Sequence, residues 1–339
     1  MINVLVVDDS ALMRKIISDM LSSDSEIKVI GTAGDGRIAL EKIKSLTPDV
    51  IVMDVEMPEM DGITALKKIM EVKPIPVIIL SALTKEGSDK TIEALEAGAI
   101  DFITKPSGII SMDLISVKQA LIEKVKVASK ASVKRVVRTE TKKYRFNPTR
   151  KKIIVIASST GGPQTLEYLL KEIPRNIPAP ILVVQHMPPG FTKSFAERLS
   201  RICEITVREA VDGDRLEDGV ALIAPGGLHM IVEEKGNDVM VRVIKEPPEL
   251  GVAPCANKLF RSIAPIFREN TIAVVLTGMG SDGTDGARMI KNVSGTVIAE
   301  AEESCIVFGM PKEVINAGLA DEIVTLDKMA VALIQIVDI

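Results

Sequence analysis

Three side chains in the second half of the sequence have the types that acyl transfer needs. Ser159, His186 and Asp282 each follow an apolar segment typical of a buried strand. A serine hydroxyl becomes a good nucleophile when a histidine within about 2.6–3.2 Å takes its proton, and a buried aspartate can then orient that histidine. Because the carboxyl ends of parallel strands meet at one edge of a sheet, the pattern favours a serine hydrolase site.

Glycines around two of these residues support this interpretation. Ser159 lies in the segment SSTGGP and Asp282 in TGMGSDG. Glycines let backbone N–H groups approach a developing oxyanion, and removing one such donor costs roughly 2.7–4 kcal/mol. Pro163 is typical of the first turn of a helix, whose positive end would favour the same negative charge.

Each of these residues also has an ordinary structural explanation. Ser159 or Thr160 could cap a helix beginning near Pro163, and Asp282 could be a turn residue. The glycine pair after Thr160 could cradle a phosphate, although no Walker lysine follows it. The second of the two histidines, His229 in APGGLHM, is expected to be structural or substrate-adjacent rather than catalytic.

A second set of reactive side chains lies in the first third of the chain. Asp8 and Asp9 follow one apolar segment and Asp54 ends another, while Ser81 and Lys105 follow two more. Carboxylates gathered at one sheet edge need a compensating cation, and hard oxygen ligands suit Mg²⁺. Asp54 could then attack a phosphoryl donor while Ser81 and Lys105 contact the phosphate oxygens. Any one of these residues alone could be a cap or a turn residue, but together they favour a phosphoacceptor pocket.

The elements that must position these residues fall into two groups. Five apolar runs in residues 1–125 alternate with helical segments, which predicts a doubly wound parallel sheet. Residues 126–152 are basic and aperiodic, which indicates an interdomain linker. In residues 153–339 we expect a larger, mostly parallel sheet in a three-layer αβα unit, with an antiparallel hairpin at 229–233 and 239–244. The apolar runs of this second unit lie at 153–157, 181–185, 220–224, 239–244, 272–276, 296–299 and 323–326.

Bulk composition excludes several classes of function. With 339 residues and a net charge of −4, the chain is long enough for about two domains and has no electrostatic attraction to nucleic acid. We expect neither a cleavable leader nor membrane insertion, since no run of about 18 apolar residues occurs. The three cysteines, Cys203, Cys255 and Cys305, are expected to be buried thiols of a cytoplasmic protein.

The first group of motifs resembles the receiver domain of two-component signalling. The motifs are VLVVDDS, GTAGDGRIAL, DVIVMDVEMPEMDG and DFITKP. The resemblance implies a flavodoxin-like (βα)5 fold in which Asp54 is phosphorylated. It places Asp8, Asp9 and the carbonyl of Glu56 with Asp54 at a Mg²⁺ ion, and Phe102 at the position of a switching aromatic.

The second group resembles the catalytic domain of chemotaxis protein-glutamate methylesterases. The motifs are ASSTGGP, VVQHMPPGFT, APGGLHM and LTGMGSDGTDGA. The resemblance implies that Ser159 is the nucleophile, His186 the general base and acid, and Asp282 its orienting partner. It also makes the backbone N–H groups of Met279 and Thr160 the candidate oxyanion donors. One departure, Ala-Ser where relatives often have Gly-Ala, leaves Ser158 beside Ser159.

The resemblance implies a phosphorylation-regulated enzyme of chemotactic adaptation. Its substrates would be glutamate γ-methyl esters, and also glutamines, on the cytoplasmic domains of chemoreceptors. A chemotaxis histidine kinase would supply the phosphoryl group and relieve inhibition by the receiver, and we expect a monomer. The esterase chemistry itself would need no cofactor. Two alternatives stay open: a non-enzymatic response regulator, and a hydrolase of small esters unrelated to receptors.

Overall fold

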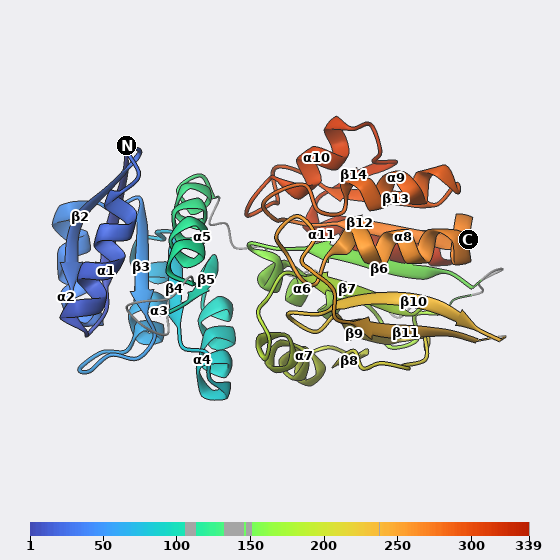
Figure 1. Cartoon of the computed structure of the whole chain (residues 1–339), viewed down its shortest axis with the longest axis horizontal. Helices are drawn as coiled ribbons and strands as arrows, with labels where there is room; N and C mark the ends of the chain where they lie inside the picture. The colour runs from blue at the N-terminus through green and yellow to red at the C-terminus, as the bar shows by residue number, and fades with distance from the viewer. Residues whose placement is uncertain (106–112, 132–145, 147–150, 237, 339) are drawn as a thin grey trace. The chain divides into compact units, whose positions relative to one another are not determined.

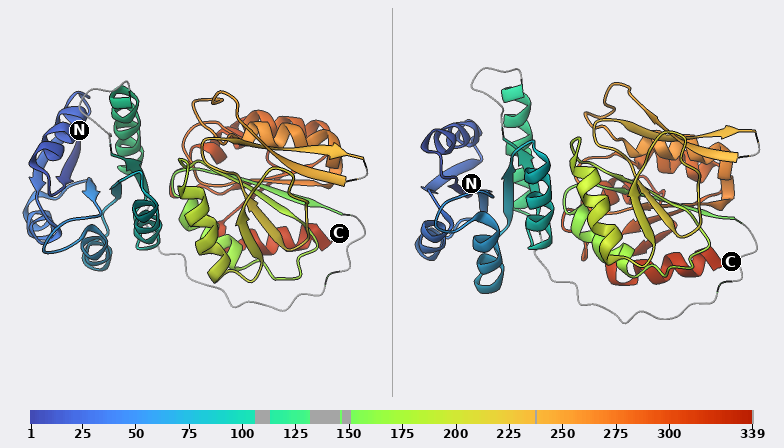
Figure 2. Two further views of the ribbon diagram at one scale, coloured as in Figure 1. Left: turned by 60° about the horizontal axis from the view of Figure 1, so that its bottom comes forward. Right: turned by 90° about the horizontal axis from the view of Figure 1, so that it is seen from below.

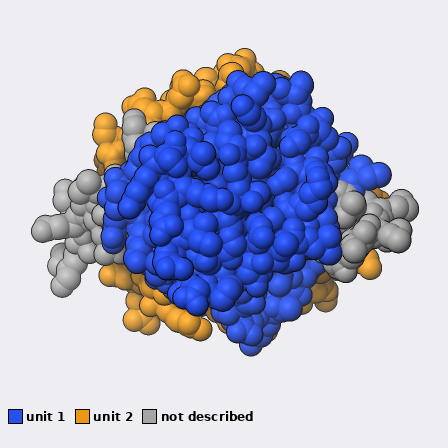
Figure 3. Space-filling model, turned by 90° about the vertical axis from the view of Figure 1, so that its left-hand side faces the viewer, with its two compact units in different colours: residues 1–133 blue, residues 134–339 orange. Residues whose placement is uncertain are grey.

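The computed structural model describes residues 1–105, 113–131, 146, 151–236 and 238–338 (Figure 1). The chain divides into two compact units, residues 1–133 and 134–339, which are coloured separately in Figure 3. Most of the predicted linker, 126–152, lies outside the described residues, and helix α5 (Asp113–Ala128) extends three residues into it. No helix among the described residues is both long enough and apolar enough to span a membrane.

The first unit is the predicted flavodoxin-like sheet. Five strands lie in the order β2-β1-β3-β4-β5, and every pair is parallel. The strands are β1 (Ile2–Val7), β2 (Ile27–Ala33), β3 (Val50–Asp54), β4 (Val77–Ser81) and β5 (Asp101–Thr104). The connecting helices before α5 are α1 (Ala11–Ser22), α2 (Gly36–Leu46), α3 (Gly62–Val72) and α4 (Lys85–Glu96).

Local sequence explains where these helices begin. Side chains of Ser10, Asp35, Asp61 and Thr84 accept hydrogen bonds from the first turns of α1, α2, α3 and α4. Such caps satisfy N–H groups that have no partner inside the helix. Because other residues supply the caps, the carboxylates of Asp8, Asp9 and Asp54 remain for another role.

The second unit is built on a seven-stranded sheet in the order β14-β13-β12-β6-β7-β9-β8. All its pairs are parallel, as the continuous apolar runs predict. The strands are β6 (Ile153–Ser158), β7 (Ile181–Gln185), β8 (Thr206–Glu209), β9 (Val220–Ile223), β12 (Thr271–Val275), β13 (Thr296–Glu300) and β14 (Glu322–Val324). The short edge strand β8 is the one that the sequence analysis missed.

Helices cover both faces of this sheet, which confirms the three-layer prediction (Figure 2). One layer holds α6 (Gly162–Lys171), α7 (Phe191–Ile202) and α11 (Leu326–Asp338). The other holds α8 (Ala256–Phe267), followed by the short 3-10 helix η1 (Arg268–Asn270), together with α9 (Thr284–Asn292) and α10 (Met310–Asn316). The expected hairpin, β10 (His229–Lys235) with β11 (Asp238–Ile244), forms a separate two-stranded sheet that packs on α8.

Candidate active site

The three candidate residues of the second unit follow three adjacent strands. Ser159 directly follows β6, His186 directly follows β7, and Asp282 lies in the loop between β12 and α9. Strand order reverses between β6 and β12, since the chain passes to β7 on one side and later returns to β12 on the other. A reversal of this kind opens a crevice at the carboxyl edge of a parallel sheet, where ligands bind.

The structure brings His186 and Asp282 into direct contact. The Nε2 atom of His186 lies 2.8 Å from Oδ2 of Asp282, and the aspartate side chain is 3% exposed. With Nε2 engaged by the carboxylate, Nδ1 is the ring nitrogen that remains to take a proton. A histidine held in this way has a fixed tautomer and a carboxylate ready to stabilise its protonated form.

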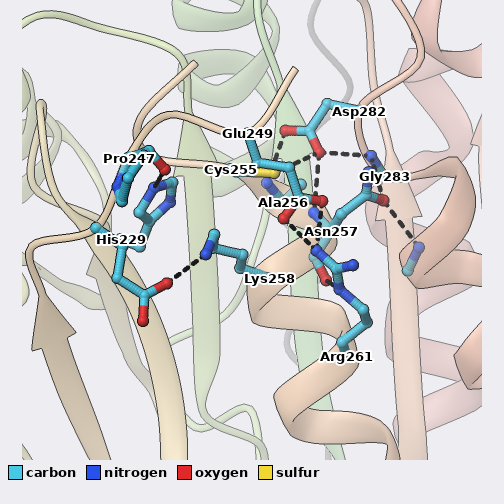
Figure 4. Close-up of polar contacts among 12 residues, drawn as sticks. His229, Pro247, Glu249, Cys255, Ala256, Asn257, Lys258, Arg261, Asp282 and Gly283 are labelled. Carbon is cyan, nitrogen blue, oxygen red and sulfur yellow. Dashed lines mark hydrogen bonds and ion pairs between the residues drawn. The ribbon is translucent and has the colours of Figure 1, made fainter. Parts of the chain in front are cut away.

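Asp282 is anchored at the N-terminus of α8 (Figure 4). Its carboxylate accepts hydrogen bonds from the N–H groups of Ala256 (2.7 Å) and Asn257 (2.9 Å), and from the thiol of Cys255 (3.0 Å). Asn257 adds a second link, because its Oδ1 accepts from the N–H groups of Gly283 and Gly286. Helix N-termini have free N–H groups and a positive end, so they hold a carboxylate firmly.

These contacts set the ionisation of the aspartate. Burial opposes the charged form of Asp282, but the contact with His186 and the hydrogen bonds from Ala256 and Cys255 outweigh it. The pKa of Asp282 therefore lies below its ordinary value. Burial and the nearby carboxylate raise the pKa of the Cys255 thiol to about 12, so this thiol stays a hydrogen-bond donor.

The two adjacent serines have different environments. Ser158 is fully buried, and its hydroxyl donates to Oε1 of Gln185 at 2.7 Å. Ser159 is partly exposed at the sheet edge. The Nε2 group of Gln185 donates to the carbonyls of Ser159 (2.9 Å) and His186 (3.2 Å), so one amide fixes both backbones. Gly162 is required here, because a Cβ at that position would lie 2.0 Å from Oε1 of Gln185.

The loop that carries Met279 packs directly on Ser159. A Cβ at Gly278 would lie 2.8 Å from Cβ of Ser159, so only glycine permits this approach. The Met279 N–H donates to no other group in the described part of the chain. Thr160, the other candidate oxyanion donor, is buried, and its carbonyl accepts from Oγ1 of Thr277 at 3.0 Å.

His229 lies with the hairpin rather than with the three strand ends. It begins β10, is fully buried, and its Nε2 donates to the carbonyl of Pro247 at 3.2 Å (Figure 4). That His229 is structural or substrate-adjacent rather than catalytic stays a prediction.

The reactive residues of the first unit converge at the carboxyl edge of its own sheet. Nζ of Lys105 lies 2.7 Å from Oδ2 of Asp54 and 2.9 Å from Oδ2 of Asp8. One carboxylate oxygen from each of Asp8, Asp9 and Asp54 lies within 4.8 Å of the others. Three hard oxygen donors at this spacing fit Mg²⁺. Asp54 and Lys105 also line a cavity of about 270 Å³.

The remaining predicted members of this pocket differ in what they contact. Ser81 lines the cavity, but its hydroxyl lies 3.3 Å from the carbonyl of Gly87 and accepts from Thr91 at 2.6 Å. The exposed side chain of Glu56 pairs with Lys90, which leaves the Glu56 carbonyl as its candidate metal ligand. Phe102 is buried in β5.

Burial and the nearby Asp8 charge raise the pKa of Asp54, although Lys105 partly offsets them. Burial acts against the charged form of Lys105 as well, but its two carboxylate partners raise its pKa above the ordinary value. A cation in the pocket would favour the ionised form of Asp54.

Comparison with known proteins finds a family match for each of the two units. Two protein-family models match the chain, the response regulator receiver domain over residues 4–114 and the CheB methylesterase over residues 154–333. The chain is 49% identical to a protein-glutamate methylesterase/protein-glutamine glutaminase of Halalkalibacterium halodurans, over 98% of each protein. This chain belongs to the CheB methylesterase family. It is also 48% identical to the protein of the same name from Geobacillus kaustophilus, over 99% of each.

A solved structure agrees with this family membership. The crystal structure of the Thermotoga maritima CheB methylesterase catalytic domain is 47% identical to this chain, with a TM-score of 0.55. The match covers 56% of this chain and 100% of that domain. Both resemblances drawn from the sequence motifs are therefore confirmed.

Sequence reasoning missed three polar residues that support the site of this CheB-family chain. Gln185 holds the backbones of Ser159 and His186, Asn257 holds the Asp282 loop, and Thr277 holds the turn after Ser159. Gln185 offers a usable signal, because it is an amide ending an otherwise apolar strand just before the candidate base. Asn257 carries no comparable signal.

Proposed function

We propose that this chain is a phosphorylation-regulated serine hydrolase acting on glutamate γ-methyl esters of chemoreceptor cytoplasmic domains. It releases methanol and thereby serves chemotactic adaptation in the cytoplasm. The observation that carries the proposal is the contact between His186 and Asp282 at 2.8 Å, at the strand ends where Ser159 also lies. The names of the full-length relatives give the substrate class.

In the proposed mechanism, Ser159 is the nucleophile. Its Oγ attacks the ester carbonyl while its proton passes to Nδ1 of His186, and Asp282 stabilises the imidazolium formed. The N–H groups of Met279 and Thr160 donate to the oxyanion of the tetrahedral intermediate. His186 then gives the proton to the departing methoxide, which leaves as methanol.

The acyl-enzyme is released by the reverse proton movements. His186 takes a proton from water, the resulting hydroxide attacks the acyl carbon, and Ser159 leaves with the proton that His186 returns. The product is an unmodified glutamate. The same steps applied to a receptor glutamine release ammonia, which supports a second activity as a glutaminase.

The receiver domain, which we assign to residues 1–125, is proposed to accept a phosphoryl group on Asp54 from a chemotaxis histidine kinase. Asp9, Asp54 and the Glu56 carbonyl would hold Mg²⁺ beside Asp8, and the ion would neutralise charge on the transferring group. Lys105 would bind the phosphate oxygens. We take residues 126–152 as the linker and residues 153–339 as the catalytic domain of a monomer.

Methanol release from a methylated chemoreceptor fragment tests this function. Wild type, Ser159→Ala, Ser158→Ala and Asp54→Ala are compared with and without a small phosphodonor and Mg²⁺. We expect Ser159→Ala to reduce turnover to background, and the phosphodonor to accelerate only proteins that retain Asp54. Activity in Ser159→Ala would rule out this nucleophile, and no methanol from any protein would favour a non-enzymatic regulator.

Control by the first unit is tested separately. Deletion of residues 1–125 should raise the basal rate, because the proposed regulation is relief of inhibition. A folded fragment that is no faster than the unphosphorylated full chain would contradict this regulation without affecting the proposed chemistry. Equal turnover of free small methyl esters and receptor would instead favour a small-ester hydrolase.

A further inference from the structure

We propose that Thr277 is a positioning residue that locks the Ser159 turn against the loop carrying Met279. This role deepens the proposed function and rests on it. Thr277 comes two residues after the end of β12 and is fully buried, so it cannot contact a substrate in solvent. It acts through the two backbone segments that it joins.

The carbonyl and the hydroxyl of Thr277 both make hydrogen bonds to other backbone segments. Its carbonyl accepts from the Ser159 N–H at 3.0 Å, and its hydroxyl lies 3.0 Å from the carbonyl of Thr160. The same hydroxyl accepts from the Val307 N–H at 2.8 Å. Thr277 therefore connects the nucleophile turn, the Met279 loop and the segment around Val307 in one buried hydrogen-bond network.

Glu300 extends this hydrogen-bond network from the neighbouring strand. It ends β13 and is fully buried, and its Oε2 accepts from the Thr277 N–H at 2.8 Å. Its Oε1 accepts from the hydroxyl of Ser304 at 2.9 Å. The Ser304 hydroxyl in turn accepts from the Leu326 N–H at 3.0 Å, so the carboxylate itself is held in place.

The geometry of acyl transfer explains why this support matters. Oxyanion donors act only when they point at the position that the charged oxygen will occupy, and a small displacement removes much of their effect. Gly278 and Met279 follow Thr277 directly, and Ser159 and Thr160 are bonded to it. The Thr277 carbonyl thus holds Ser159, while its hydroxyl ties the Thr160 carbonyl to the segment around Val307 and so helps to set the position of the Thr160 N–H relative to the Met279 loop.

Thr271 provides a matched control at the start of the strand that leads to Thr277. It begins β12, and it is fully buried like Thr277. Its hydroxyl has no hydrogen-bond partner among the described residues. Thr271→Val and Thr277→Val make the same chemical change in the same sheet, but only the second removes hydrogen bonds.

The test measures methanol release from the methylated receptor fragment by the full-length chain. Thr277→Val should lower kcat about 10- to 100-fold with KM changed less than about 2-fold, because support for the transition state is lost. Affinity for a boronic acid that forms a tetrahedral serine adduct should fall in parallel. Thr271→Val should stay within about 2-fold of wild type in both measurements.

A second pair of variants keeps the test informative if Thr277→Val does not fold. Thr277→Ser and Thr277→Cys both lack the methyl group and differ only in the donor atom. Ser should stay within about 3-fold of wild type and Cys should be slower, because a thiol is a weaker donor. Urea unfolding checks that the compared variants are folded.

Several results would overturn the role of Thr277. These are a kcat of Thr277→Val within about 3-fold of wild type, an equal loss in Thr271→Val, or equal rates for Ser and Cys at position 277. Ser159→Ala distinguishes the two proposals. Background turnover in Ser159→Ala with an unchanged Thr277→Val overturns the positioning role alone, whereas full turnover in Ser159→Ala overturns the proposed function and this role with it.

Discussion

Asp54 of the first unit and Asp282 of the second both lie at the carboxyl edge of a parallel sheet but have opposite pKa shifts. Both are buried at the carboxyl edge where the strand order reverses, with exposures of 5% and 3%. Asp54 accepts from one neighbouring N–H and pairs with Lys105, and its pKa is raised. Asp282 accepts from two N–H groups of α8, a thiol and His186, and its pKa is lowered.

The difference shows that the donors around a buried carboxylate, rather than its burial, decide what it can do. Desolvation is the largest influence on both residues and raises both pKa values. The many donors around Asp282 reverse that influence and leave the carboxylate fixed and charged, as an orienting group must be. Asp54 keeps an open side toward a cavity of about 270 Å³, which an attacking carboxylate needs.

The largest effect should come from Asp282→Asn compared with Asp54→Asn. Removing the charge beside His186 should lower kcat for methanol release about 10⁴-fold, because the histidine loses its tautomer control and its counter-charge. Asp54→Asn should keep the basal rate and lose only the response to the phosphodonor. Comparable basal losses in the two variants would show that the two carboxylates do not have separate roles.

A third buried carboxylate tests whether donors decide the pKa. Burial raises the pKa of Glu300 from 4.5 to about 7, although hydrogen bonds from Thr277, Ser304 and Cys305 partly offset it. The folded state therefore holds this proton between about pH 4.5 and 7 while the unfolded state releases it. The free energy of unfolding should fall by about 3 kcal/mol as pH rises through this range.

Urea unfolding at pH 5 and pH 8 measures this slope, and Glu300→Gln should remove it. The contribution of Asp282 to the free energy of unfolding depends on pH in the opposite direction. It is present above the unfolded pKa near 3.8 and is lost as pH falls through the lower folded pKa. If the free energy of unfolding changes equally between pH 5 and pH 8 in wild type and Glu300→Gln, the Glu300 pKa is not raised by folding.

Mg²⁺ binding should depend on the carboxylates of the first unit and not on Asp282. Asp9→Asn should weaken Mg²⁺ binding to the full chain about 10- to 100-fold, since it removes one of three clustered carboxylates. Asp282→Asn should leave the Kd for Mg²⁺ unchanged. Isothermal titration calorimetry provides the measurement, and equal Kd values for wild type and Asp9→Asn would place the ion elsewhere.

The smallest effect concerns a single donor to Asp282. Cys255→Ala removes one hydrogen bond and should lower kcat about 5-fold, in line with a net value of about 1 kcal/mol for one bond. Cys255→Ser restores a donor and should recover most of that loss. If Ala and Ser variants have the same kcat, the thiol contributes packing rather than a hydrogen bond.

Much of the fold was predictable from local patterns. The continuous apolar runs predicted buried parallel strands, and the sheets confirm this in both units. Strand β8 was missed because Thr206–Glu209 carries two charged residues in four and lies at the sheet edge, where one side needs no partner. The hairpin was predicted, but its separation from the main sheet depends on packing against α8, which no local pattern shows.

The sequence by itself determined which residue types follow which strands, because strand formation and helix caps depend on neighbouring residues. It therefore brought Ser159, His186 and Asp282 into one hypothesis and Asp8, Asp54 and Lys105 into another. Tertiary structure alone decided that Ser158 is buried against Gln185, that Nε2 of His186 contacts Asp282, and that α8 anchors this aspartate. Such contacts join residues 26 to 96 positions apart, and their energies depend on burial and direction, which exist only after the chain has folded.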